Sequence, residues 1–233
     1  MGLIEIGGAI LSRAAERVDV CAQNLTNVTT PGYKARTQFS SLIAATANNS
    51  SSDAKPKNAG IDFTNGALQN TGNPLDLAIS GSGFFAVRDT SGATLYTRNG
   101  QFSRDSDGRL VTSGGSILQS LSGDLVAGHG DLKILSDGTV LNDGAPVGRV
   151  ALANFADQND LRSVGGSLFS APQGSAKPAV GEVRQGMLEA SNVSTALEMV
   201  TIMQDLRSAG AGAHVVQLYD DLMGRAVTAF GQS

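Results

Sequence analysis

The first 30 residues place the strongest constraint on the fold. Apolar residues recur there at every seventh position, and a second row of small or apolar residues follows each of them three places later. This a/d heptad pattern predicts an α-helix that packs against another helix along one narrow face. The two rows are Ile4, Leu11, Val18 and Leu25, and Gly7, Ala14, Cys21 and Val28. Thr30-Pro31-Gly32 then ends the helix, because proline lacks a backbone N–H and disfavours helical angles in the residue before it.

A second heptad pattern lies at the opposite end of the chain. Ser194 is placed to cap a helix there, since its hydroxyl can accept a hydrogen bond from a free backbone N–H. The predicted contact row is Met199, Ile202, Leu206, Ala209, Ala213, Val216, Asp220, Met223, Val227 and Phe230. Two such helices can pair with each other, and the apolar residues left outside the pair favour association with further copies or with related chains.

Two glycines, Gly210 and Gly212, lie inside this second helix. In a helix interior each costs roughly 0.5–1 kcal/mol relative to alanine. They permit either a close approach of another helix or a kink. Sequence drift that assembly tolerates is the alternative, and the sequence does not decide between these interpretations.

The middle of the chain has the period of β-strands. Short apolar runs, such as residues 84–87, alternate there with glycine turns, and Gly81-Ser82-Gly83 and Asn99-Gly100 are typical of hairpins. Further turns are predicted at Asp107-Gly108, Gly114-Gly115, Asp137-Gly138 and Asp143-Gly144. The predicted fold class is therefore α+β, with N- and C-terminal α-helices pairing as a coiled coil and a central all-β domain of many short strands.

Changes in composition divide the chain into five predicted segments. They are an N-terminal helix (1–32), an extended or loop linker (33–60), the central β domain (61–170), a connector (171–185) and a C-terminal helical segment (186–233). The linker is predicted from a polar, unpatterned tract, and the connector from its prolines and glycines.

Composition and motifs argue against several classes of function. The 17 basic and 21 acidic residues give a net charge of −4, without the clustered basic surface that nucleic acid requires. The single cysteine, Cys21, is interpreted as a small buried residue of the contact row. Residues 81–86 have the letters of a dinucleotide fingerprint, but a strand follows them where a helix is required. A calcium-like loop that starts at Ser103 has Gly114 where the twelfth position requires glutamate.

No local pattern for catalysis emerges either. Glu182, Glu189 and Glu198 are sparse and are interpreted as solvent-exposed, with nothing that pairs them for acid–base chemistry. We therefore expect no catalytic residue, cofactor, metal, nucleic-acid partner or small-molecule substrate. No stretch approaches the ~18 consecutive apolar residues of a membrane span, and no cleaved signal peptide is expected.

Five stretches resemble the bacterial flagellar rod and hook protein family. Asn24-Leu25-Thr26-Asn27-Val28-Thr29-Thr30-Pro31-Gly32-Tyr33-Lys34 is similar to that family's N-L-A-N-x-x-T-P-G-[YF]-[KR] signature. The other stretches are residues 73–87, 96–102, 108–112 and 186–193, and the five follow the family's order. Together they extend the resemblance over the chain from end to end.

The resemblance implies a structural subunit of the flagellar basal-body rod that self-assembles through its terminal helices into a helical axial structure for motility. In that family the terminal helices form an inner coiled-coil tube, and the β domain packs outside it. The implied partners are other copies of the chain, neighbouring rod proteins and the flagellar type III export apparatus. Export without a cleaved signal peptide and a place in the periplasm-spanning rod are implied as well. The modest length favours the proximal rod protein, with the distal rod protein as the alternative.

The expected assembly interface follows from the two heptad patterns and the signature turn. Its residues are Ile4, Leu11, Val18, Asn24, Leu25, Asn27, Pro31, Gly32, Met199, Ile202, Leu206, Val216, Met223 and Val227. The Pro31-Gly32 turn is interpreted as a rigid hinge between the helical and the β layer. A hypothesis of another class is a secreted β-rich binding module that presents Tyr96, Arg98 and Phe102 on a ligand-facing sheet.

Overall fold

The structure, a computed structural model, describes residues 3–37, 60–179 and 181–230, without the side chains of residues 3, 159 and 226–230. The chain forms two compact units. One unit combines the two ends of the chain, Met1–Thr26 and Ser194–Ser233, and the other is Asn27–Val193. The first unit is therefore discontinuous in sequence, because the second is inserted between its halves.

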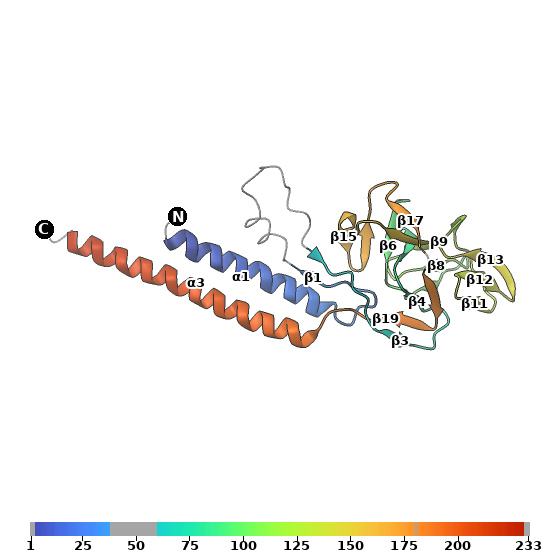
Figure 1. Cartoon of the computed structure of the whole chain (residues 1–233), viewed down its shortest axis with the longest axis horizontal. Coiled ribbons are helices and arrows are strands. Elements are labelled where there is room, and N and C mark those ends of the chain that lie inside the picture. The colour runs from blue at the N-terminus through green and yellow to red at the C-terminus, as the bar shows by residue number, and fades with distance from the viewer. Residues whose placement is uncertain (1–2, 38–59, 180, 231–233) are drawn as a thin grey trace. The chain divides into compact units, whose positions relative to one another are not determined.

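The first unit is a pair of antiparallel helices that lie side by side (Figure 1). They are α1 (Leu3–Thr26) and α3 (Thr195–Phe230). The Glu198 N–H donates to the Ser194 carbonyl at 3.0 Å, which places Ser194 at the predicted N-cap position. The prediction of paired terminal helices is thus confirmed. Within the described parts of the chain, neither helix is long and apolar enough to cross a membrane.

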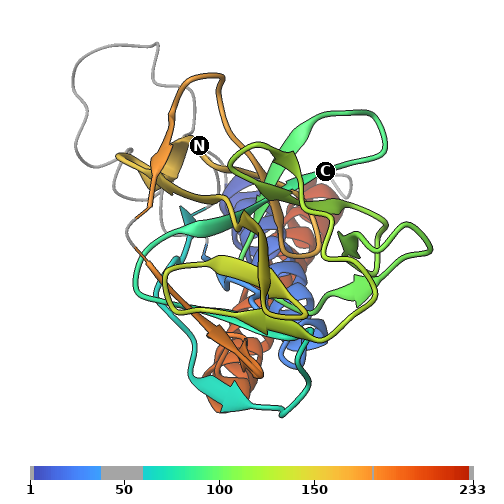
Figure 2. The same cartoon turned by 90° about the vertical axis from the view of Figure 1, so that its right-hand side faces the viewer.

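The second unit, here called the β unit, consists of short strands and one 3₁₀ turn, η1 (Gln158–Asp160). The strands are β1 (Arg36–Thr37), β2 (Gly60–Ile61), β3 (Leu68–Asn70), β4 (Leu77–Ser80), β5 (Phe84–Arg88), β6 (Thr94–Thr97), β7 (Ser103–Arg104), β8 (Leu110–Val111), β9 (Ile117–Ser120), β10 (Gly123–Asp124), β11 (Leu132–Ile134), β12 (Thr139–Asn142), β13 (Ala145–Arg149), β14 (Leu152–Phe155), β15 (Arg162–Gly165), β16 (Leu168–Ser170), β17 (Ala176–Pro178), β18 (Glu182–Gln185) and β19 (Met187–Glu189). Figure 2 looks onto this unit and shows its strands running in several directions.

The largest sheet has the strand order β15-β16-β6-β5-β9-β8-β7, with β10 beside β9 and β14 joining β5 to β17. A three-stranded sheet follows the order β11-β12-β13, and β1-β2, β4-β18 and β3-β19 form two-stranded sheets. Neighbouring strands in these sheets are antiparallel. The predicted all-β middle of many short strands is therefore confirmed.

Four of the predicted turns close hairpins between consecutive strands. They are Asp107-Gly108, Gly114-Gly115, Asp137-Gly138 and Asp143-Gly144, which join β7 to β8, β8 to β9, β11 to β12 and β12 to β13. The second residue of each of these pairs is a glycine with a φ between 75° and 85°. Glycine adopts this left-handed conformation without the strain that a Cβ would cause.

The two turns taken as the hairpin signals were predicted wrongly. β4 pairs with β18 and not with β5, so Gly81-Ser82-Gly83 carries the chain from one sheet to another. Asn99-Gly100 follows β6, whose partners are β5 and β16. The Gly100 carbonyl accepts the Leu77 N–H at 2.9 Å, and a Cβ on Gly100 would overlap the Leu77 carbonyl. This glycine therefore allows two backbone segments to approach closely.

β5 separates two hydrophobic cores because both of its faces are buried. Phe85 lies in the larger core and packs edge-on against Phe102, with the ring centroids 5.6 Å apart. Phe84 points into a smaller aromatic core, where it contacts Phe155 at 5.8 Å and Phe169 at 5.9 Å. The run of residues 84–87 is therefore apolar at every position.

The segment expected to be a connector, 171–185, contributes two strands, β17 and β18. β18 pairs with β4, and Val183 on it is buried in the larger core opposite Ile79. Residues 187–189 form a further strand, β19, and α3 begins only at Thr195. Most of the expected linker, 33–60, lies outside the described residues.

Candidate assembly interface

Small and polar residues make the contact between α1 and α3. On α1 the buried residues include Gly7, Ala14 and Cys21, which form one of the two predicted heptad rows. Among the residues of α3 whose side chains are described, the buried ones are Asp205 and Gly212, also seven positions apart. The contact therefore brings the two backbones close together at these small residues.

The remaining predicted residues of α1 differ in exposure. Ile4 and Leu11 are each 43% exposed, whereas Val18 and Leu25 are half-buried. Asn24, at the end of α1, is buried. The large apolar side chains at the start of the helix are thus left outside the helix pair.

On α3 the row that contains Met199 and Leu206 was predicted to contact α1, and for these two residues the prediction was wrong. Met199 is 51% and Leu206 58% exposed. The neighbouring row, which contains Asp205 and Gly212, faces α1 instead, because Gly212 permits a close approach and Asp205 has a partner on α1. Val216, another predicted position, does pack against α1, since a Cβ on Gly7 would lie 2.8 Å from Val216 Cγ2. Of the other predicted positions, Ile202 is half-buried, Met223 is exposed, and the side chain of Val227 lies outside the described residues.

The two helices approach most closely at Gly7 and Gly212. A Cβ on Gly212 would lie 3.1 Å from Ile10 Cγ2 and 3.2 Å from the Gly7 carbonyl oxygen. A Cβ on Gly7 would lie 3.2 Å from the Gly212 carbonyl oxygen. By contrast, a Cβ on Gly210 would meet no described atom within 4 Å. Of the three interpretations left open for these glycines, close helix contact therefore holds for Gly212.

Gly212→Ala is expected to destabilise the helix pair by about 1–2 kcal/mol, because overpacking at the contact outweighs the better helix propensity of alanine. The matched variant Gly210→Ala should stabilise the same helix by about 0.5–1 kcal/mol. Thermal unfolding followed by far-UV circular dichroism measures both effects. Equal stabilisation by the two substitutions would show that the helices are not in close contact at Gly212.

A polar cluster lies at the other end of the helix contact. Asn24 Nδ2 donates to Glu198 Oε1 at 2.8 Å, and Arg17 Nε lies 3.0 Å from Asp205 Oδ1. Burial raises the pKa of the Cys21 thiol to about 12, assisted by its hydrogen bond to Glu198 and by the charges of Glu198 and Asp205. A thiol with so high a pKa stays protonated and unreactive, as expected for a buried structural cysteine. Glu198 is half-buried and paired, so its interpretation as solvent-exposed was wrong.

Large apolar side chains are exposed along both helices. They are Ile4, Ile6, Ile10 and Leu11 on α1, and Leu197, Met199, Val200, Met203, Leu206, Leu218, Leu222 and Met223 on α3. We call these twelve residues the outer apolar surface. Exposed apolar side chains in such numbers on two paired helices favour a protein–protein contact.

In the β unit, three of the signature stretches meet at one buried carboxylate. Lys34 Nζ lies 2.7 Å from Glu189 Oε1, and Arg98 Nη1 lies 3.0 Å from Glu189 Oε2. The three side chains are at most 4% exposed. Burial lowers the pKa of Lys34 and of Arg98, and the charge of Glu189 opposes this change in both. Glu189, interpreted from the sequence as solvent-exposed, is therefore the centre of a buried charge cluster.

Hydrogen bonds hold the signature turn against β19 and the residues that follow it. The Gly32 N–H donates to the Glu189 carbonyl at 2.7 Å, and the Ala35 N–H donates to Asn192 Oδ1 at 2.7 Å. Gly32 has a φ of 65°, and a Cβ there would overlap the backbone of Arg98. Asn27 and Pro31 are half-buried. The turn is thus tightly packed into the β unit.

The residues proposed for a ligand-facing sheet do not form one. Arg98 and Phe102 are buried, and the Tyr96 ring packs edge-on against Phe155 with the centroids 4.8 Å apart. Arg98 also lies over the Phe84 ring, 5.4 Å from its centroid. These side chains serve the interior of the β unit, so the binding-module hypothesis loses the residues on which it was based.

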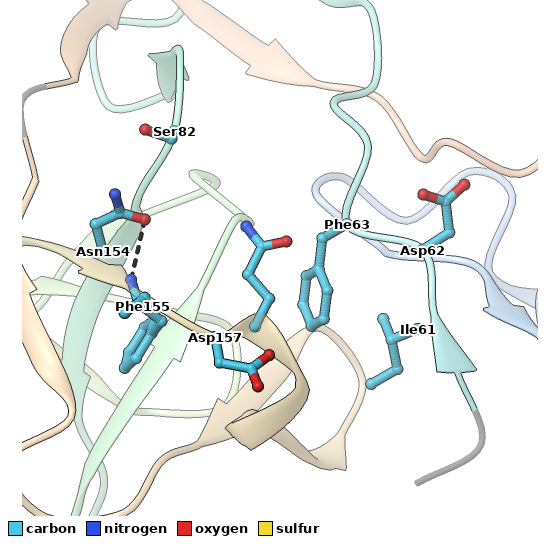
Figure 3. Close-up of a pocket in the computed structure, with 9 residues that line it drawn as sticks. Ile61, Asp62, Phe63, Ser82, Asn154, Phe155 and Asp157 are labelled. Carbon is cyan, nitrogen blue, oxygen red and sulfur yellow. Dashed lines mark hydrogen bonds between the residues drawn. The ribbon is translucent and has the colours of Figure 1, made fainter. Parts of the chain in front are cut away.

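A groove of about 520 Å³ opens beside the smaller aromatic core (Figure 3). Its lining consists of Ile61, Asp62, Phe63, Ser82, Asn154, Phe155, Ala156, Asp157 and Gln158. Small-molecule sites are usually lined by apolar side chains with a few polar groups. Here carboxylate, amide and hydroxyl groups form most of the lining.

Across the described ranges, no three His, Cys, Asp or Glu side chains are grouped so that they could hold a metal ion.

Comparison with known proteins gives matches in both units. Residues 78–142 match the family model of the flagellar hook protein FlgE/F/G D1 domain, and residues 184–229 match that of the flagellar basal body rod FlgEFG protein C-terminal. The flagellar basal-body rod protein FlgF of Caulobacter vibrioides is 31% identical over 92% of each chain. This chain belongs to the flagellar basal-body rod protein family.

Two FlgG rod proteins are similar as well. That of Borreliella burgdorferi is 31% identical over 89% of this chain and 90% of its own, and that of Agrobacterium fabrum is 29% identical over 95% and 97%. The family resemblance carried by the five signature stretches is confirmed. The rod protein described here is a structural component of the flagellar basal body, and the signature lysine, arginine and glutamate form its buried charge cluster.

Proposed function

We propose that this rod protein assembles through the outer apolar surface into a helical axial structure, with further copies of itself and neighbouring rod proteins as partners. The observation that carries the proposal is the difference between the buried and the exposed residues of the two helices. Small and polar residues are the most buried positions of the α1–α3 contact, while most of the large apolar side chains of both helices are exposed. Subunits whose contacts do not close into a ring continue as a filament, which is the symmetry of an axial structure.

The same proposal covers delivery and place. The flagellar export apparatus delivers the chain without a cleaved signal peptide, the assembled rod spans the periplasm, and the role is structural without turnover of a substrate. The seven-residue repeats at both ends of the chain support this role, because they supply faces for helix packing.

We further propose that the chain is a FlgF-type subunit of the proximal rod. The lengths of the alignments support this assignment. The alignment with the Agrobacterium fabrum FlgG runs over 255 positions although it covers only 95% of this chain of 233 residues, so that relative has insertions that are absent here. The alignment with the Caulobacter vibrioides FlgF runs over 227 positions at 92% coverage and needs far fewer insertions. A FlgG-type distal subunit is the alternative.

Leu206→Asp is expected to abolish motility and to exclude the protein from the rod, because a carboxylate would be buried in the apolar contact between subunits. The β unit should fold as before, since Leu206 is exposed on α3. Leu11→Asp should act in the same way from α1. The measurements are swimming of a deletion strain that carries the variant, the protein content of purified basal bodies, and urea unfolding of the purified chain.

Gln204→Asp, at another exposed position of α3, provides the matched control and should retain motility. Normal incorporation of Leu206→Asp would refute assembly through the outer apolar surface.

For a proximal subunit, we expect the protein to restore motility to a strain that lacks only its FlgF gene, and not to one that lacks only FlgG. The reverse result would assign the chain to the distal rod.

A further inference from the structure

The small residues of the α1–α3 contact do not by themselves define one register of the two helices. Gly7, Ala14 and Cys21 repeat every seven positions along α1. A slip of one heptad, about 10 Å along the helix axis, would again place small residues of α1 against α3. Another feature must therefore select the observed register.

Two polar contacts have the spacing that such a selection requires. Arg17 pairs with Asp205 at 3.0 Å, and Asn24 pairs with Glu198 at 2.8 Å. The two α1 residues are seven positions apart, and so are the two α3 residues. Because the helices are antiparallel, both contacts form together in only one register.

A slip in either direction breaks this set of contacts. One slip moves Arg17 to the level of Glu198, which separates Asn24 from its carboxylate and places Ile10 at the level of Asp205. A buried carboxylate that loses its cation is strongly destabilising. The opposite slip moves Arg17 to the level of Gly212, away from both carboxylates, and leaves Glu198 beyond the end of α1 without its partner Asn24. Both slipped registers are thus disfavoured.

We infer that Arg17, Asn24, Glu198 and Asp205 form a polar clamp whose role is to select one register of α1 against α3. Stability alone does not account for the cluster. Asp205 is 2% exposed, and its Oδ2 atom is buried without a hydrogen-bond partner among the described residues. An unsatisfied buried acceptor is costly, and buried polar groups in coiled coils are retained for register at the expense of stability.

The register has a consequence that rests on the proposed function. Residues of the outer apolar surface lie on both helices, for example Leu11 on α1 and Met203 on α3. A slip of one heptad would shift the α1 part of this surface by about 10 Å relative to the α3 part. A neighbouring subunit that contacts both parts would then lose one of them. The clamp therefore defines the assembly surface without being part of it.

Spin-label distances in the full chain test the clamp directly. The labels are attached to Glu16→Cys on α1 and Gln217→Cys on α3, both exposed positions, in a Cys21→Ala background. The test variant replaces the four clamp residues together (Arg17→Leu, Asn24→Leu, Glu198→Leu, Asp205→Leu). It should retain its helix content, because apolar residues often replace buried ion pairs without loss of stability.

The chain with the intact clamp should give one distance, and the test variant should give a second population displaced by about 10 Å. The control variant, Arg13→Leu with Arg207→Leu at exposed positions of the same helices, should keep the single distance. A single unchanged distance in the test variant would refute the proposal, since the glycine contact and the chain connections would then suffice. Loss of the helical signal would refute it too, because the clamp would then supply stability. The result does not depend on rod assembly, so failure of the assembly proposal would be seen separately in the motility assay.

Discussion

Glu189→Ala is expected to destabilise the β unit by about 3–5 kcal/mol, which is the usual cost of removing one partner from a buried charge cluster. The substitution leaves the Lys34 ammonium and the Arg98 guanidinium buried without their shared carboxylate. It also removes the acceptor of the Gly66 N–H, which donates to Glu189 Oε1 at 2.9 Å. The measurement is urea unfolding of the purified chain, followed by circular dichroism.

Glu182→Ala is the matched control on β18, the strand that precedes β19 in the chain. Glu182 pairs with Arg184 at 2.7 Å, but both side chains are more than half exposed. An exposed pair of this kind contributes between 0 and about 1 kcal/mol. If the two alanine variants unfolded at the same urea concentration, Glu189 would not be the centre of a buried cluster in solution.

Gly32→Ala is expected to destabilise the β unit by about 3–4 kcal/mol. Part of this cost is the left-handed conformation, at roughly 1–2 kcal/mol for a residue with a Cβ. The remainder is overpacking, because the Cβ would overlap the backbone at Arg98 and Asn99, which cannot move as a flexible side chain would.

Gly72→Ala separates these two contributions. Gly72 has a φ of 70°, close to the 65° of Gly32, but a Cβ there would meet no described atom within 4 Å. The control should therefore lose only the conformational contribution of about 1–2 kcal/mol. Equal losses in the two variants would mean that the signature turn is not packed against Arg98. Urea unfolding under identical conditions provides the comparison.

Features of the fold that depend on residues close together in the sequence were predictable from the sequence. The heptad rows predict the two helices, and four Asp-Gly or Gly-Gly pairs predict hairpins, because the conformation of such a turn is set by the turn residues themselves. The prediction of a hairpin at Asn99-Gly100 was wrong because this glycine is required by its close contact with the backbone of Leu77, which is distant in sequence. The strands within 171–185 escaped prediction for the same reason, since β18 pairs with β4 from the start of the β unit.

The site shows a similar limit. Lys34 and Arg98 are separated from Glu189 by 155 and 91 positions, so no local pattern marks the three charges as partners. Their presence in three different signature stretches was the one available signal. Met199 and Leu206 were assigned to the helix contact because they are large apolar residues at heptad positions of the C-terminal helix. An assembling subunit also needs apolar residues outside its own core, and hydrophobicity alone does not distinguish the two uses.

The bonds between the signature turn and residues 189–192 have a consequence for the entropy of the chain. In the unfolded chain, α1 and α3 are the ends of a loop that includes all of residues 27–193. The folded β unit joins the two ends of that loop, through the Gly32–Glu189 and Ala35–Asn192 hydrogen bonds, so the helices meet as if a short turn connected them. Loop-closure entropy makes this difference worth about 3 kcal/mol. The β unit therefore raises the effective concentration of one helix for the other, and variants that unfold it should separate the helices as well.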